Sequence, residues 1–136
     1  MLSQPEIDAI ARCLAAGGRV VAGYATGFLD EEGRIADARP RGLAEAFGLR
    51  QAAFDHADAA HAWRIGALAA TGNHARLEPR GCRVLMAGDD GRPVLTAHQD
   101  GRAISCAIDL GSLLWNRVAG TEPVVAALLA ALRDVT

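Results

Sequence analysis

The sequence has 136 residues and no lysine, so all 14 of its basic residues are arginine. With 16 acidic residues the formal net charge is −2, which argues against a surface for nucleic acid or for an anionic membrane. An apolar run long enough to span a membrane is also lacking, as is the basic-then-apolar start of a signal peptide. We therefore expect no nucleic-acid partner, no membrane partner and a cytoplasmic location.

Cysteine is scarce as well. Cys13, Cys82 and Cys106 lie far apart in the sequence, and no C-x-x-C pair occurs. An odd, scattered set does not form a disulfide framework and lacks the spacing of a zinc or redox site. We interpret the three thiols as small apolar residues in a reducing compartment.

The chain lacks internal repeats, low-complexity tracts and linkers rich in proline and serine. Hydrophobic residues make up 51% of it and charged residues 22%, a balance typical of a folded globular chain. A chain of this length can bury a core without disulfides or metals. We predict one domain over residues 1–136.

The N-terminal pattern indicates a helix followed by a strand. Ser3 and Glu6 have the spacing of a capping box, and Gly17 with Gly18 ends the helix that they begin. Residues 19–25 then form an almost continuous apolar run, which favours a strand buried on both faces. Because this order is the second half of a β-α-β unit, the sequence predicts an α/β fold with a parallel sheet.

The middle of the chain gives weaker signals. Residues 41–47 predict a short helix that places Leu43 and Phe47 on one face, with Gly48 as its terminator. Residues 49–62 show no clear period, and we interpret them as irregular, with at most one helical turn. The segment 63–68 could form a strand.

The second half changes period. Short apolar runs at residues 82–87, 93–98 and 103–110 are separated by Asp-Gly turn signals, which predicts an antiparallel meander. A last helix is expected over residues 121–134. Its expected buried stripe consists of Val124, Val125, Leu128, Leu129 and Leu132.

The loop after the first predicted strand is the best candidate for a ligand or contact site. In an open parallel sheet, ligands and partners meet the loops at the carboxyl ends of strands. An alternative is that its acidic residues only solvate an exposed turn. The candidate residues are Thr26, Gly27, Asp30, Glu31 and Glu32.

Nucleophilic catalysis finds little support. A G-x-[SC]-x-G elbow does not occur, and Gly81-Cys82-Arg83 supplies only one of its glycines. His98 follows Cys82 on a predicted hairpin, which leaves little chain for a crossover between nucleophile and base. Adjacent acids in one loop, such as Asp30 and Glu31, seldom face each other across a substrate. We assign no catalytic residues.

Metal and phosphate sites are also disfavoured. His56 and His61 are five residues apart, which splays two helical side chains, although an irregular segment could bring them together with Asp55 and Asp58. The glycine pair Gly17-Gly18 precedes a strand, whereas a phosphate loop opens a helix. We expect no metal and no cofactor.

Several stretches resemble one known family, the trimerisation domain of β-galactosidases of glycoside hydrolase family 42. The N-terminal helix with its Ala-Gly-Gly end, the Val-Val-Ala-Gly-Tyr-Ala-Thr-Gly strand end and the Asp-Glu-Glu-Gly loop are similar to the family pattern. The match continues at residues 43–50, 91–95 and 100–111 and is poor over residues 51–80.

This resemblance implies a flavodoxin-like fold, similar to class I glutamine amidotransferases, as a three-layer sandwich without a catalytic nucleophile. It also implies an accessory role in which the domain helps to form a dimer or trimer, or joins the catalytic domain of a glycoside hydrolase. The family normally has a further β-α-β stretch before the first helix, so we expect either a piece of a longer protein or a small relative whose trimmed sheet has an exposed edge.

Two alternatives remain open at this stage. One is a sugar-binding module that uses the loop at residues 27–33 with Trp63 or Trp115 as a stacking platform, although aromatic residues make up only 4% of the chain. The other is an amidotransferase-like hydrolase with a cryptic site around Cys82, His98 or the Asp30 loop.

Overall fold

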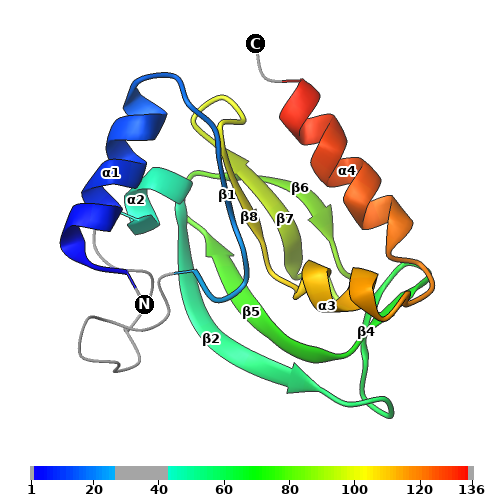
Figure 1. Cartoon of the computed structure of the whole chain (residues 1–136). Helices are drawn as coiled ribbons and strands as arrows, with labels where there is room; N and C mark the ends of the chain where they lie inside the picture. Colours follow the sequence, from blue (N-terminus) through cyan, green and yellow to red (C-terminus); the bar gives the residue numbers. More distant parts are fainter. Residues whose placement is uncertain (1, 27–42, 135–136) are drawn as a thin grey trace.

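The computed structural model describes residues 2–26 and 43–134, and it combines helices with three small sheets (Figure 1). In chain order the elements are α1 (Gln4–Ala15), β1 (Val20–Ala22), α2 (Leu43–Phe47), β2 (Leu49–Ala57), β3 (Trp63–Ile65), β4 (Leu68–Ala70), β5 (Gly72–Pro79), β6 (Arg83–Ala87), β7 (Pro93–His98), β8 (Ala103–Cys106), α3 (Leu110–Trp115) and α4 (Glu122–Arg133).

The largest sheet has the strand order β1-β8-β7-β6. Its edge strand β1 is parallel to β8, with Val20 opposite Ala103, whereas β8, β7 and β6 pair antiparallel. The sheet is therefore partly parallel, as predicted for an α/β fold, and the predicted C-terminal meander is confirmed. Helices α1 and α2 pack near β1, β8 and β7, while α4 packs against β6.

The capping box predicted for α1 is confirmed. The Ser3 backbone N–H donates to Glu6 Oε2 at 2.6 Å, and the Ser3 hydroxyl oxygen accepts from the Glu6 backbone N–H at 3.4 Å. At the other end, Gly17 has a φ of +87°, a conformation that glycine adopts without steric cost. A Cβ on Gly18 would lie 2.4 Å from Cys13 Sγ, so only glycine fits at this close approach.

The second sheet shows that the interpretation of residues 49–62 as irregular was wrong. Strand β2 occupies nine of these residues and pairs antiparallel with β5, a strand that the sequence pattern did not indicate. The register shifts between Gln51 and Ala53, and this irregularity interrupts the period-two alternation on which strand prediction rests.

Two shorter predicted segments also differ from the structure. The segment 63–68 holds β3 and the start of β4, two antiparallel strands that turn at Gly66 with a φ of +58°. The strand expected at residues 103–110 ends at Cys106, and α3 begins at Leu110. Asp109 caps that helix by accepting a hydrogen bond from the Ser112 N–H at 3.1 Å.

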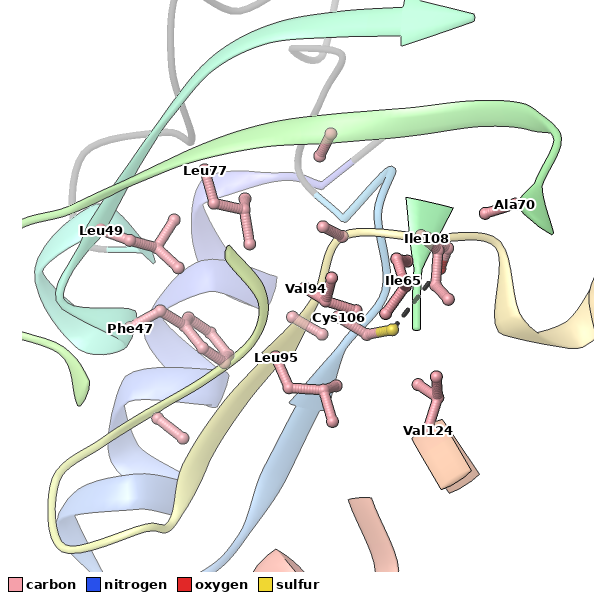
Figure 2. Packing of buried hydrophobic residues seen from close by; sticks show 14 of the residues in the cluster. Phe47, Leu49, Ile65, Ala70, Leu77, Val94, Leu95, Cys106, Ile108 and Val124 are labelled. Carbon is pink, nitrogen blue, oxygen red and sulfur yellow. Dashed lines mark hydrogen bonds between the residues drawn. The ribbon is translucent and has the colours of Figure 1, made fainter. Parts of the chain in front are cut away.

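The hydrophobic core lies between the main sheet, α2 and the β2-β5 ribbon (Figure 2). Phe47 and Leu43 of α2 are buried, as the short helix predicted, and they meet Leu49, Leu95 and other apolar residues of the core. Most of the meander strand β7 is buried on both faces. Core residues at the carboxyl ends of β1 and β8, Ala22 and Cys106, are also buried, and one candidate site lies beside these ends.

The C-terminal helix α4 was predicted correctly in position, but its burial was not. Of the five residues in the predicted stripe only Val124 is buried, whereas Leu129 is 46% exposed. In β1, Val21 is 45% exposed, so the expectation of a strand buried on both faces was also wrong. Helix α4 packs mainly near β6, and its Leu128 meets Val21 of β1 only across an open groove. No helix in the described part of the chain is long and apolar enough to cross a membrane.

Candidate functional site

An apolar groove of about 390 Å³ opens where β1 and β8 end. Because these strands are parallel, their carboxyl ends lie at the same edge of the sheet, where the predicted contact loop begins. Helix α4 closes the groove from the other side with Leu128. Its larger or charged lining residues are Val21, Tyr24, Thr26, Ile108, Asp109, Leu110 and Leu128.

Exposed apolar side chains continue from the groove along α3 and α4. Trp115 at the end of α3 is 87% exposed, and Leu114 beside it is 48% exposed. Together with Val21 and Leu129 they make up four of the five large apolar residues that are exposed in the described chain. Such a concentration on neighbouring elements is typical of a surface that meets another protein. We call the groove and these four residues the apolar surface.

The predicted contact loop is only partly described. Thr26 lies in a turn, where its N–H donates to the Gly23 carbonyl at 3.2 Å, and it lines the groove. Gly27, Asp30, Glu31 and Glu32 lie outside the described residues. The role of the loop therefore stays a prediction.

A second site is a polar cavity of about 470 Å³ between the β2-β5 ribbon, β3 and the turn that joins β6 to β7. Its central group is the carboxylate of Asp55 on β2. Asp55 Oδ2 accepts from Arg76 Nη2 at 2.8 Å and from Arg92 Nη1 at 3.0 Å, and His74 Nε2 lies 3.9 Å from the same oxygen. We call this site the polar cavity.

Trp63 forms one wall of the polar cavity and is held on several sides. Its indole N–H donates to Asp90 Oδ1 at 3.1 Å, the Arg92 guanidinium carbon lies 4.7 Å from the ring centroid, and the His74 ring lies 4.8 Å from it. A Cβ on Gly88 would lie 2.4 Å from Trp63 Nε1, so glycine is required there. Since Trp63 is only 5% exposed, its ring does not offer the stacking platform considered from the sequence.

Electrostatics in the polar cavity follow from these contacts. Burial acts to raise the pKa of the Asp90 carboxyl, but hydrogen bonds from Arg92 and Trp63 outweigh it and hold the pKa below its ordinary value. Burial lowers the pKa of His74, and a hydrogen bond to the Gly72 backbone opposes this effect only in part. Asp90 is therefore an anion at neutral pH and His74 is a neutral imidazole.

The histidines considered as metal ligands separate in the structure. His56 Nδ1 lies 2.8 Å from Asn73 Oδ1, whereas His61 Nδ1 lies 3.0 Å from Asp58 Oδ1. Both line the mouth of the polar cavity. Within residues 2–26 and 43–134, no group of three histidine, cysteine or acidic side chains could hold a metal ion.

Cys82 and His98 come close, but they do not form a hydrogen-bonded pair in the described structure. The pairing of Arg83 with Ala97 places the two residues on neighbouring strand ends. The His98 ring lies against Gly48, where a Cβ would approach its Nδ1 to 2.6 Å. Packing against the backbone therefore accounts for the position of His98.

Six polar residues of the cavity were missed from the sequence, namely Arg64, His74, Arg76, Asp89, Asp90 and Arg92. His74 and Arg76 lie on β5, the strand that was not predicted, and being two residues apart they share one face of it. Asp90 and Arg92 belong to a turn that was recognised only as a hairpin signal. One sequence signal for the positions of Asp90 and Arg92 was available, the Asp-Asp-Gly-Arg turn. Within this turn Asp90 accepts a hydrogen bond from the Arg92 N–H at 3.0 Å, as aspartate often does in turns.

The sequence matches the protein family described as beta-galactosidase trimerisation domain over residues 1–130. The chain belongs to this family. The resemblance found from its motifs is thereby confirmed, including across the poorly matching stretch at residues 51–80. No curated protein matches the chain.

Solved structures with the same fold include a catalytic mutant of a GH42 beta-galactosidase from G. stearothermophilus, at a TM-score of 0.70 and 18% identity over 85% of this chain and 20% of that one. A beta-galactosidase from the haloarchaeon Halorubrum lacusprofundi gives a TM-score of 0.69 and 20% identity over 86% of this chain and 20% of that one. An exo-beta-1,4-mannosidase from an Opitutaceae bacterium, strain TAV5, gives a TM-score of 0.60 and 15% identity over 97% of this chain and 23% of that one. The chain thus spans about a fifth of the length of these proteins.

Proposed function

We propose that the chain is a non-catalytic domain that assembles copies of itself through the apolar surface, three being the number in the family description. The observation that carries the proposal is the exposure of Val21, Leu114, Trp115 and Leu129 on β1, α3 and α4, the elements that line the groove. Burying exposed apolar area gains about 25 cal/mol per Å². Covering these residues therefore provides a driving force for association.

The surroundings of the apolar surface support a second copy as its occupant. Strand β1 is an edge strand whose described pairing is to β8 alone, and unpaired edges are normally covered in an assembly. The predicted contact loop begins at Thr26, on the rim of the same groove. We infer that this loop, including Asp30, Glu31 and Glu32, contributes to the contact.

Family membership also supports a finer fold type and a setting for the domain. The parallel β1-β8 pair beside an antiparallel meander supports the flavodoxin-like, amidotransferase-like fold that the motifs implied. The similar solved proteins are glycosidases about five times as long, which supports a role beside a glycoside hydrolase catalytic domain in carbohydrate metabolism. A cytoplasmic location remains our prediction.

The test is the solution mass, measured by light scattering coupled to gel filtration over a range of concentrations. We expect a trimer for the native chain. Replacing Leu129 with Glu places a charge inside the contact and should weaken association at least about tenfold, because burying an unpaired charge costs several kcal/mol.

The matched control replaces Val84 with Glu. Val84 is also an exposed apolar residue, but it lies on β6 at the opposite edge of the sheet. This variant should assemble as the native chain does. A native chain that stays monomeric, or equal effects of the two substitutions, would refute the proposal.

A further inference from the structure

The polar cavity contains a buried polar atom that the structure leaves unsatisfied. His74 is only 4% exposed, and its Nε2 has no hydrogen-bond partner among the described residues. The imidazole also has a hydrogen bond to the Gly72 backbone, which we assign to Nδ1 because Nε2 has no partner. Leaving a buried acceptor unpaired costs about 1–3 kcal/mol, so the position of His74 calls for a donor inside the cavity.

The carboxylate of Asp55 cannot supply that donor. Asp55 Oδ2 lies 3.9 Å from His74 Nε2 and is a carboxylate oxygen, which only accepts hydrogen bonds. It already accepts from Arg76 and Arg92. A hydroxyl group of a bound molecule that reaches His74 Nε2 would supply that donor.

The charges that line the polar cavity indicate which molecule would fit. Three arginines and three aspartates line it, so their formal charges cancel. An anion would approach the carboxylates and a cation would approach the guanidinium groups, at a cost in either case. A neutral molecule with many hydroxyl groups avoids both costs, because each hydroxyl can donate to a carboxylate or imidazole and accept from arginine. The charged residues are Arg64, Arg76, Arg92, Asp55, Asp89 and Asp90.

We propose that the polar cavity is a binding site for a neutral, hydroxyl-rich small molecule, with mono- and disaccharides as the chemical class. One hydroxyl donates to His74 Nε2, a neighbouring hydroxyl donates to the Asp55 carboxylate, and both accept from the arginines around it. The cavity volume of about 470 Å³ lies within the range of small-molecule sites. This site is separate from the apolar surface and does not depend on the assembly function.

The two tryptophans of the chain make a direct test possible. Trp115 is 87% exposed and lies on α3, so Trp115→Phe leaves Trp63, in the cavity wall, as the single tryptophan. D-galactose and lactose, titrated to about 50 mM, should change the Trp63 emission with a millimolar dissociation constant, near 4 kcal/mol of binding free energy. Inorganic phosphate at the same concentrations should not change it.

His74→Phe keeps an aromatic ring beside Trp63 and removes both imidazole nitrogens. We expect sugar affinity, measured by calorimetry, to fall at least about tenfold. The matched control is His61→Phe at the exposed mouth of the cavity, which should change affinity less than about twofold. Circular dichroism of each variant verifies that it is folded.

A measurement on the native side chain keeps the proposal testable if His74→Phe does not fold. In ¹⁵N-resolved spectra of the native imidazoles, a hydroxyl that donates to His74 Nε2 should shift that nitrogen signal in proportion to sugar bound. The proposal is wrong if neither sugar changes the Trp63 emission or the His74 signal. It is also wrong if phosphate produces the same change, or if His74→Phe binds as tightly as the native chain.

Discussion

The apolar surface and the polar cavity differ in how far each satisfies its own side chains. In the cavity, Asp55, Trp63, Asp90 and Arg92 contact one another, and their hydrogen bonds hold the β2-β5 ribbon against the β6-β7 turn. On the apolar surface, Trp115 extends into solvent without an apolar cover. The first arrangement stabilises the folded chain, whereas the second stabilises it only when something else covers the surface.

This contrast assigns different consequences to mutations in the two regions. A polar network inside one chain contributes to the free energy of unfolding at any protein concentration. An apolar patch that is buried only on association contributes to stability in proportion to the logarithm of concentration. Substitutions in the cavity should therefore act on the isolated chain, and substitutions on the surface should act on the assembly.

The largest effect is expected at the centre of the polar cavity. Asp55→Ala removes the carboxylate shared by Arg76 and Arg92 and leaves two guanidinium groups facing each other near His74. We expect a loss of about 2 kcal/mol in the free energy of unfolding, less than for a fully buried pair because the Asp55 side chain is 30% exposed. Urea denaturation measures this loss.

Asp58→Ala is the matched control, since Asp58 is exposed and its described side-chain partner is His61. Its effect should stay within about 0.5 kcal/mol. Equal losses for the two substitutions would mean that the network does not stabilise the fold.

A smaller effect is expected from a pair of truncations within α4. Val124 is 1% exposed and belongs to the core, so Val124→Ala should cost about 1.5 kcal/mol in the free energy of unfolding. Leu129→Ala removes more carbon but from an exposed position, and in a dilute, dissociated sample it should cost less than about 0.5 kcal/mol. Thermal unfolding at low concentration measures both, and a larger loss at Leu129 would show that the apolar surface is covered within one chain.

The fold was predictable where local signals agree with tertiary packing. Ser3 and Glu6 fix the start of α1 through their own hydrogen bonds, and the Asp-Gly turns fix the meander. Strand β2 was missed because its period is interrupted at Gln51 and its partner β5 is supplied from elsewhere in the chain. The burial of α4 was misjudged because an amphipathic pattern identifies an apolar face but not what covers it.

The candidate sites divide in the same way. Thr26 was proposed from the sequence because strand ends in a parallel sheet mark contact positions, and its role in a contact stays a prediction. The polar cavity depends on Asp55, His74 and Arg92 meeting from three distant segments. The sequence around each of these residues does not indicate that they come into contact. Asp55 was therefore considered only for a metal site with His56 and His61.

The smallest expected effect is a dependence of stability on pH that originates in the cavity. Burial lowers the pKa of His74 below its ordinary value of 6.5, and the nearby cations Arg92 and Arg76 lower it further, while Asp55 and the Gly72 backbone act against them. The folded chain thus binds a proton at this site less readily than the unfolded chain does. The stability that His74 contributes is complete above pH 6.5 and is lost as the pH falls through the lowered pKa of the folded state.

Urea denaturation between pH 7.5 and 5 should show a falling free energy of unfolding for the native chain, and His74→Phe should remove part of that slope. Asp90 cannot produce it, because its lowered pKa acts only below 3.8. An unchanged slope in the variant would show that His74 is solvated as well in the folded chain as in the unfolded one. In that event the unsatisfied Nε2, on which the sugar site is argued, would already have water as its partner.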